Sequence, residues 1–502
     1  MSEKSEKIIY PSVDLFVYQL AFGLGADEDK TKANAKKFLA NFPEELQEQA
    51  GTKIEVLEKQ EKLGILQSDL TFFCDRPKEE YPLPNSEKFQ CKSYPLEGHY
   101  DAARLGDSYG FLLDASVEEE DKKEILKLRS TSSFGEALEP LVAKKSGNLG
   151  KTCILYGYLP PGADAEVLAG SIYREFVQKQ ISQEELAKQN LSKEEFLDWA
   201  WKLNQKQRGK FLGADFFVAW QPPQIWEDLP LYRGIYIILY PDPEPQLKIL
   251  DEAAHFHENW LRLFWFQNKI FWARDQGREL KQKLEENFGK MRETALEIKR
   301  INLGEGKPSV SDLDLQHLQS VLKNRSKTIA NYALNLSLLE IQQTTLDTNL
   351  YNYRLCLEDL EAKAKRTEET DLGVLRQFAD IADRRYKTQL QKDYASLKPG
   401  LDALENLINP LNSIVDLEQA QRDRDFQANV ETWGFGLAIA AVVAATFSPA
   451  VPTILKHEKS DRPPEALAVE TFVVATAVSL LAGFVARFLA PLFLRIGKKR
   501  RG

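Results

Sequence analysis

Apolar and polar positions divide this chain into three parts with different patterns. Residues 1–245 hold short apolar runs separated by turn signals, which is typical of mixed strands and helices. Residues 246–432 have the three-and-four spacing of long helices. The last part holds two long, almost uncharged runs. The pattern predicts an α+β domain, then a long α-helical coiled-coil or stalk, then a C-terminal pair of apolar helices.

The first part is predicted to form a layered α/β domain. Strand Thr152–Leu159, helix Ala163–Lys179 and strand Leu231–Tyr240 follow one another, an order that favours a compact layer structure. Further strands are predicted at the start of Ile9–Phe22, at Lys53–Leu57 and at Leu70–Cys74. Ser146–Thr152 (SGNLGKT) carries a lysine at 145 where a phosphate loop needs glycine, and a strand follows it. A glycine-rich turn is the better interpretation.

The second part is dominated by one heptad seam. A helix is predicted over residues 252–300, and a second begins near Leu315. From Leu315 to Leu360, steps of three and four residues reach almost only apolar side chains. A further helical stretch runs from Asp371, and Pro399-Gly400 is expected to interrupt it. The seam fits both an oligomeric coiled coil and antiparallel helices within one chain, because both use the same spacing.

The third part is predicted to form a transmembrane hairpin. Residues 433–455 contain no charged side chain and residues 471–494 contain only Arg487. About 20 apolar residues are enough to cross a hydrocarbon core of about 30 Å. We therefore predict transmembrane helices at 433–455 and 471–495, joined by a short outer loop at 456–470. A buried hairpin in a soluble core is the alternative, although two such runs beside a basic end are rare there.

Charges beside the hairpin predict its orientation. The tail, residues 496–502, holds Lys498, Lys499, Arg500 and Arg501, and basic residues near the ends of spans favour the cytoplasm. The N-terminus lacks a basic stretch followed by an apolar core, so no signal peptide is expected. We predict a multi-pass protein of the inner or plasma membrane, with both termini and a large domain in the cytoplasm. Four dispersed cysteines fit a reducing compartment.

Net charge limits the partners. The formal charge is −9 and the pI is near 5.5, which argues against nucleic-acid binding because a basic stripe would be expected. The lipid bilayer is the partner that the apolar runs imply.

Candidate functional residues lie in the predicted spans. Trp433 fits the aromatic belt at a membrane interface. Small residues share one face of the first span and would suit either helix packing or the lining of a narrow pore: Gly434, Ala438, Ala441, Ala445 and Ser448. Arg487 is either functional or extends toward the cytoplasmic headgroups, and its place near the basic end favours the second.

The rest of the sequence offers few candidates for catalytic or metal-binding residues. No catalytic arrangement can be assembled from its residues, so we predict that the chain is not an enzyme. His255 and His257 are two apart and would point to different faces of a helix, whereas helical metal-binding pairs are usually three or four apart. We therefore predict no metal site, and no cofactor is implied.

The layout resembles the CorA-type cation transporter superfamily from about residue 150 to 502. The matching features are a helical stretch that enters the first span near Trp433 and the basic tail Lys498-Lys499-Arg500-Arg501. The resemblance implies a cation as transported ion and a homo-oligomer, a pentamer with the first span around its pore. The Gly-Met-Asn of that superfamily is absent, and Ser448–Pro452 stands in its place.

Two functions remain open from the sequence. The first is a CorA-like homo-oligomeric ion channel or transporter with a divergent or lost selectivity filter. The second is a membrane-anchored coiled-coil scaffold or ligand-sensing protein without transport activity. The seam and the missing filter motif favour the second, while the stalk and the small-residue face favour the first.

Overall fold

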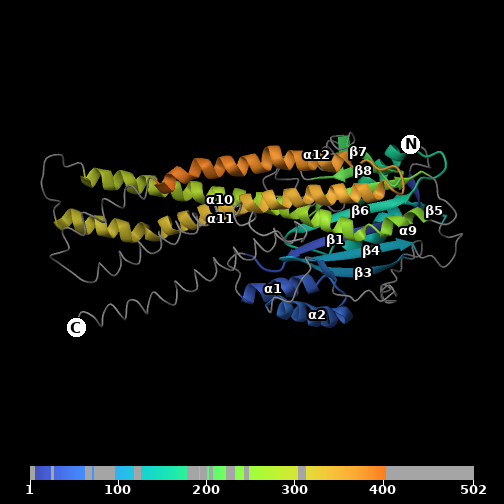
Figure 1. Cartoon of the computed structure of the whole chain (residues 1–502), viewed down its shortest axis with the longest axis horizontal. Coiled ribbons are helices and arrows are strands. Elements are labelled where there is room, and N and C mark those ends of the chain that lie inside the picture. Colours follow the sequence, from blue (N-terminus) through green and yellow to red (C-terminus); the bar gives the residue numbers. More distant parts are fainter. Residues whose placement is uncertain are drawn as a thin grey trace, which may run out of the picture. The chain divides into compact units, whose positions relative to one another are not determined.

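The computed structural model describes residues 6–23, 28–62, 70–72, 96–117, 126–177, 192, 201–202, 207–221, 232–241, 248–302 and 312–402 (Figure 1). The chain forms two compact units. Unit 1 comprises Met1–Asp275 and Thr345–Thr388, and unit 2 comprises Gln276–Thr344 and Gln389–Gly502. Each unit is described by itself.

Unit 1 is built on one mixed sheet. Its described strands have the order β2-β3-β4-β1-β6-β9-β8-β7, and β5 also pairs with β1. Only β6 and β9 are parallel among these pairs. The strands are β1 Lys7–Leu20, β2 Leu70–Phe72, β3 Leu96–Leu105, β4 Ser108–Val117, β5 Leu128–Ser130, β6 Gly150–Tyr158, β7 Arg208–Phe211, β8 Ala214–Trp220 and β9 Tyr232–Tyr240.

Helices cover both faces of the central strands. On one face lie the first turns of α10 (His257–Asn302), where Phe16 of β1 contacts Phe264 and the Tyr18 hydroxyl donates to the Leu261 carbonyl at 2.8 Å. On the other face, Phe38 and Phe42 beside α1 and α2 pack on β4. Because both faces are covered, β1 is buried along almost its whole length. The helices there are α1 Glu28–Leu39, α2 Glu44–Lys62, α4 Thr131–Val142 and α5 Ala165–Ile172, which continues as the π-helix η3 Tyr173–Val177.

The remaining helices of unit 1 are α9 (Lys248–Ala254), the end of α11 (Asp312–Ala364), α12 (Gly373–Ile381) and the π-helix η4 (Ala382–Lys387). The end of α11, α12 and η4 pack on α10. Phe378 of α12 contacts both Phe271 of α10 and Tyr353 of α11. The connection between α11 and α12 exchanges backbone hydrogen bonds with edge strand β7 at Lys210 and Asp371. This pairing satisfies an edge that would otherwise be open to another chain.

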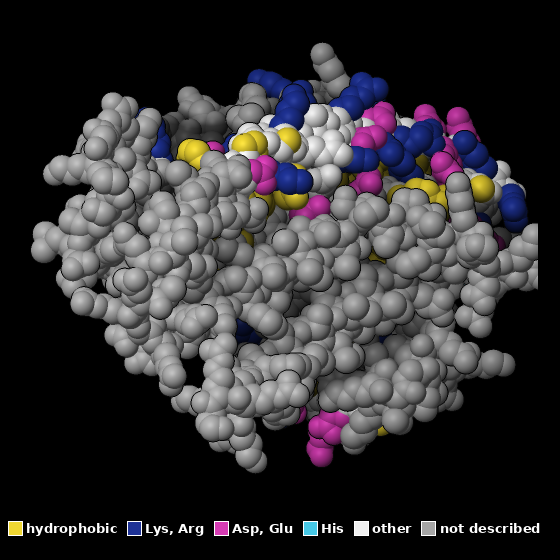
Figure 2. Space-filling model, turned by 60° about the vertical axis from the view of Figure 1, so that its left-hand side comes forward, with side chains coloured by type: hydrophobic (Ala, Val, Ile, Leu, Met, Phe, Trp, Pro, Cys, Tyr) yellow, Lys and Arg dark blue, Asp and Glu magenta, His cyan; other side chains and the backbone are white. Residues whose placement is uncertain are grey.

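Unit 2 contains three helical segments that pack on one another: the later parts of α10, the first part of α11 and residues 389–402. Gly277 of α10 lies against Leu390 and Leu339. The Tyr332 hydroxyl donates to the Leu397 carbonyl at 2.6 Å, and Lys281 pairs with Asp393 at 2.8 Å. Helices of the same chain therefore bury part of the heptad seam. On the described residues visible in Figure 2, acidic and basic side chains lie side by side.

Most predicted elements are confirmed, and the mixed sheet with long helices follows the predicted fold class. The strands at Thr152–Leu159 and Leu231–Tyr240 are β6 and β9, and the predicted helix between them is α5 with η3. The glycine-rich turn is confirmed, because the Gly150 N–H donates to the Gly147 carbonyl before β6. The seam residues from Ile329 to Leu360 belong to α11, and nearly all of them are buried.

Two predictions are wrong. Lys53–Leu57 is not a strand but part of α2, because Glu, Gln and Lys on both sides are strong helix formers and Ile54 and Ala50 share the buried face. Pro399-Gly400 does not interrupt the helix, which continues to residue 402. Gly400 fits closely against Tyr332 and Phe288, so tertiary packing outweighs the local helix-breaking tendency.

No helix in the described part of the chain is long and apolar enough to cross a membrane. The predicted spans at 433–455 and 471–495, the loop at 456–470 and the tail at 496–502 lie outside the described residues.

Candidate functional site

A row of ionisable side chains crosses three neighbouring strands of unit 1. Asp114 of β4 lies directly opposite His99 of β3 on one side and Asp14 of β1 on the other. Residues directly opposite each other in a sheet project from the same face. Asp14 shares this face with Phe16, which contacts α10. The pairing therefore places His99, Asp114 and Asp14 side by side under the helix.

His257 completes the group from above the sheet. It is the first residue of α10, and its Nε2 lies 3.2 Å from Asp14 Oδ2. Two aromatic neighbours fix this end of the helix, because Phe256 and Trp260 are buried against Phe211 of β7. We name His99, Asp114, His257 and Asp14 the His–Asp cluster.

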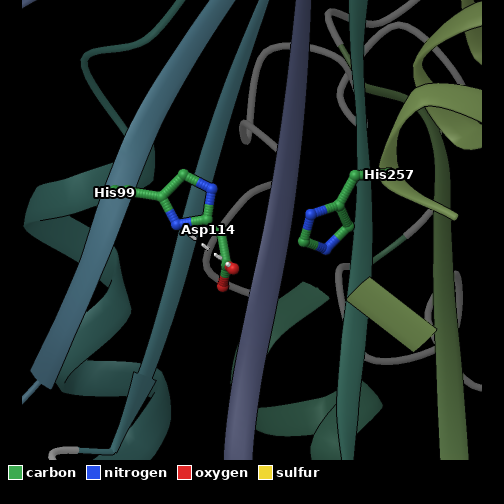
Figure 3. Close-up of side chains that lie close together, drawn as sticks. All are labelled: His99, Asp114 and His257. Carbon is green, nitrogen blue, oxygen red and sulfur yellow. Dashed lines mark ion pairs between the residues drawn. The ribbon is translucent and has the colours of Figure 1, made fainter. Parts of the chain in front are cut away.

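The two histidines lie on either side of the Asp114 carboxylate, with their rings tilted relative to each other (Figure 3). His99 Nδ1 lies 3.5 Å from Asp114 Oδ2, and the ring centroids of His99 and His257 are 6.2 Å apart. One ligand atom from each of His99, Asp114 and His257 lies within 4.8 Å of the other two. These three side chains are partly exposed, whereas the Asp14 side chain is only 2% exposed. The arrangement can hold a proton or a metal ion.

Charge at the cluster is unbalanced toward the negative. Burial alone lowers the pKa of His257, but the carboxylate of Asp14, with Asp114 and Asp101, outweighs burial and raises this pKa to about 9. His257 therefore carries a positive charge at neutral pH in the metal-free chain. Two carboxylates directly opposite each other on neighbouring strands repel, so a cation between or beside them is stabilising.

Polar groups buried near Asp14 gather around its carboxylate. Asp14 Oδ2 lies 3.2 Å from His257 Nε2, and the Tyr156 hydroxyl on β6 also interacts with Asp14. The Tyr240 hydroxyl at the end of β9 has no hydrogen-bond partner among the described residues. Burial, with the nearby Asp14 carboxylate, raises the pKa of Tyr156, so this hydroxyl stays protonated. Buried polar groups are nearly always satisfied, which makes the Tyr240 hydroxyl unusual.

The histidine pair considered from the sequence is separated as expected. The His255 side chain is 76% exposed beside Glu252, whereas His257 faces Asp14. The partners of His257 come from strands far away in the sequence, and sequence spacing alone does not connect them. One signal is nevertheless visible in the sequence, because Asp14 is a lone charge inside the apolar strand Ser12–Tyr18.

The candidate residues of the predicted hairpin lie outside the described residues, so the structure does not bring them together or separate them. They are Trp433, Gly434, Ala438, Ala441, Ala445, Ser448 and Arg487.

No protein-family model, no curated protein and no solved structure matches this chain.

Proposed function

We propose that this protein is a membrane-embedded, homo-oligomeric ion channel or transporter of CorA-like layout, with a divergent or lost selectivity filter. The observation that carries the proposal is the pair of apolar runs at 433–455 and 471–495, with the basic tail after them. A soluble α+β unit with long helices fits the body that such a hairpin would anchor. The helical residues up to 402 precede the first run in sequence, as a stalk would.

The small-residue face of the first span is where the proposal is tested. The full chain is purified in mild detergent, its particle symmetry is determined, and it is reconstituted into liposomes for cation-flux measurements. Ala441→Phe is expected to abolish flux because a large ring would fill a narrow pore. Val443→Phe is the matched control, since two residues along a predicted helix would place residue 443 on the opposite face, and flux should persist.

Three outcomes would contradict the channel. They are a monomer in detergent, liposomes that pass no ion, and equal effects of the two substitutions. A ring of subunits with cation flux that only Ala441→Phe removes supports it.

A membrane-anchored scaffold or ligand-sensing protein is the second candidate. Two observations favour it: the seam of α11 is buried by helices of its own chain, and unit 1 holds an ionisable cluster remote in sequence from the hairpin. This function predicts that an unrelated two-span anchor can replace residues 433–495 without loss of activity in cells. Loss of activity on that exchange argues for the channel.

A further inference from the structure

We propose that His99, Asp114 and His257 bind a divalent transition-metal ion of the zinc class, with Asp14 holding His257 in place. This site departs from the expectation from sequence that the chain has no metal site. It is independent of the proposed transport function, because it lies wholly within unit 1 and its test measures binding without any flux.

The donor set matches the chemistry of zinc. Two imidazole nitrogens and one carboxylate oxygen, with a fourth position left for water or another ligand, form a common zinc environment. Magnesium and calcium prefer sites made of oxygen atoms alone, so the two imidazoles disfavour them. The donors come from three elements, β3, β4 and α10, which the fold brings together.

The geometry is close to what a metal ion requires. Tetrahedral coordination with bonds of about 2.0–2.1 Å places donor atoms about 3.4 Å apart. His99 Nδ1 and Asp114 Oδ2 are already 3.5 Å apart. All three donor atoms lie within 4.8 Å of one another, so they must move closer together by about 1 Å at most to bind one ion. Their partial exposure leaves a path for the ion from solvent.

A second observation fits the same ion. Asp14 is 1% exposed, and its Oδ2 pairs with His257 Nε2 at 3.2 Å. A histidine that binds a metal usually turns its other ring nitrogen to a carboxylate, which fixes the orientation of the ring. Asp14 can fill this role at Nε2, and the ion replaces the proton on Nδ1 of His257, which is released to solvent. The ion would also offset the repulsion between Asp14 and Asp114.

The test uses the full chain in detergent, stripped of metal with a chelator. Cobalt(II) serves as the probe, because its visible absorption reports tetrahedral coordination, and zinc displaces it to give the zinc affinity. The expected result is about one ion per chain. His99→Ala and His257→Ala should each weaken binding at least tenfold, and Asp14→Asn should weaken it about 10–100-fold.

His255→Ala is the matched control, since it removes an exposed histidine two residues from His257 and should leave the affinity unchanged. Zinc should raise the melting temperature of the native chain and of His255→Ala, but not that of His99→Ala. Should His257→Ala fail to fold, His99→Ala and Asp114→Asn carry the test. Absence of stoichiometric binding overturns the proposal. Binding that survives both His99→Ala and Asp114→Asn also overturns it, because the ion would then be held by other groups such as thiols.

Discussion

Asp14 controls the charge of His257 in the metal-free protein. Burial by itself lowers the pKa of this histidine, and the Asp14 carboxylate is the nearest group that raises it to about 9. We predict that Asp14→Asn lowers the pKa of His257 well below 9. Selective ¹³C labelling of histidine with NMR titration of the chelated full chain measures this directly, since the chain has five histidines. An unchanged His257 titration would contradict the assignment.

The same ion pair makes stability depend on pH. The pKa of His257 is raised on folding from about 6.5 to about 9, so its stabilising contribution is fully present below pH 6.5. That contribution is lost as pH rises from about 6.5 through 9. We expect the free energy of unfolding of the chelated chain to fall over this interval. His257→Gln should remove that part of the slope, and denaturant unfolding at a series of pH values measures it.

Few residues of the His–Asp cluster can be predicted from the sequence alone. Asp14 stands out in the sequence as a charge in an apolar strand, whereas the spacing of His255 and His257 does not point to the partners of His257. Neither His99 nor Asp114 stands out, because both belong to strands whose alternation looks ordinary. Their proximity comes from the register between β3, β4 and β1, which depends on contacts distant in sequence.

The packing of the long helices is tested by two glycines of α10. A Cβ atom at Gly277 would lie 2.1 Å from the Leu390 side chain, whereas nothing lies within 4 Å of one at Gly289. We predict that Gly277→Ala destabilises the chain by about 1–3 kcal/mol through overpacking. Gly289→Ala should instead stabilise it by about 0.5–1 kcal/mol, because alanine favours the helix. Thermal or denaturant unfolding measures both, and equal effects of the two changes would contradict this packing.

Helices and strands can be predicted where the spacing of apolar residues stays regular over a long segment. The seam of α11 and the apolar runs of β6 and β9 are examples. Prediction failed where local signals conflict with their surroundings. Lys53–Leu57 has a strand-like alternation but lies inside a long run of helix formers, and Pro399-Gly400 lies where Tyr332 and Phe288 pack closely on the helix. Strand order was not predictable, because it depends on pairing between residues far apart in the chain.

For the whole molecule, the chain should enter the membrane with a defined orientation. Lys498, Lys499, Arg500 and Arg501 lie within a few residues of the end of the second apolar run, whereas the loop between the runs mixes both signs of charge. Basic residues near span ends are retained in the cytoplasm, so the tail should lie inside and the loop outside.

Single engineered cysteines test this orientation in intact cells. Ser460→Cys lies in the loop and should react with a membrane-impermeant maleimide. Gly502→Cys lies in the tail and should react only after the cells are opened, which makes it the matched control. The native cysteines, Cys74, Cys91, Cys153 and Cys356, all precede the first run and should stay unlabelled in intact cells. Labelling of Gly502→Cys in intact cells with no labelling of Ser460→Cys would show the reverse orientation. Equal labelling of the two cysteines would show that the second run does not cross the bilayer, and the channel would then be untenable because its pore requires both spans to cross.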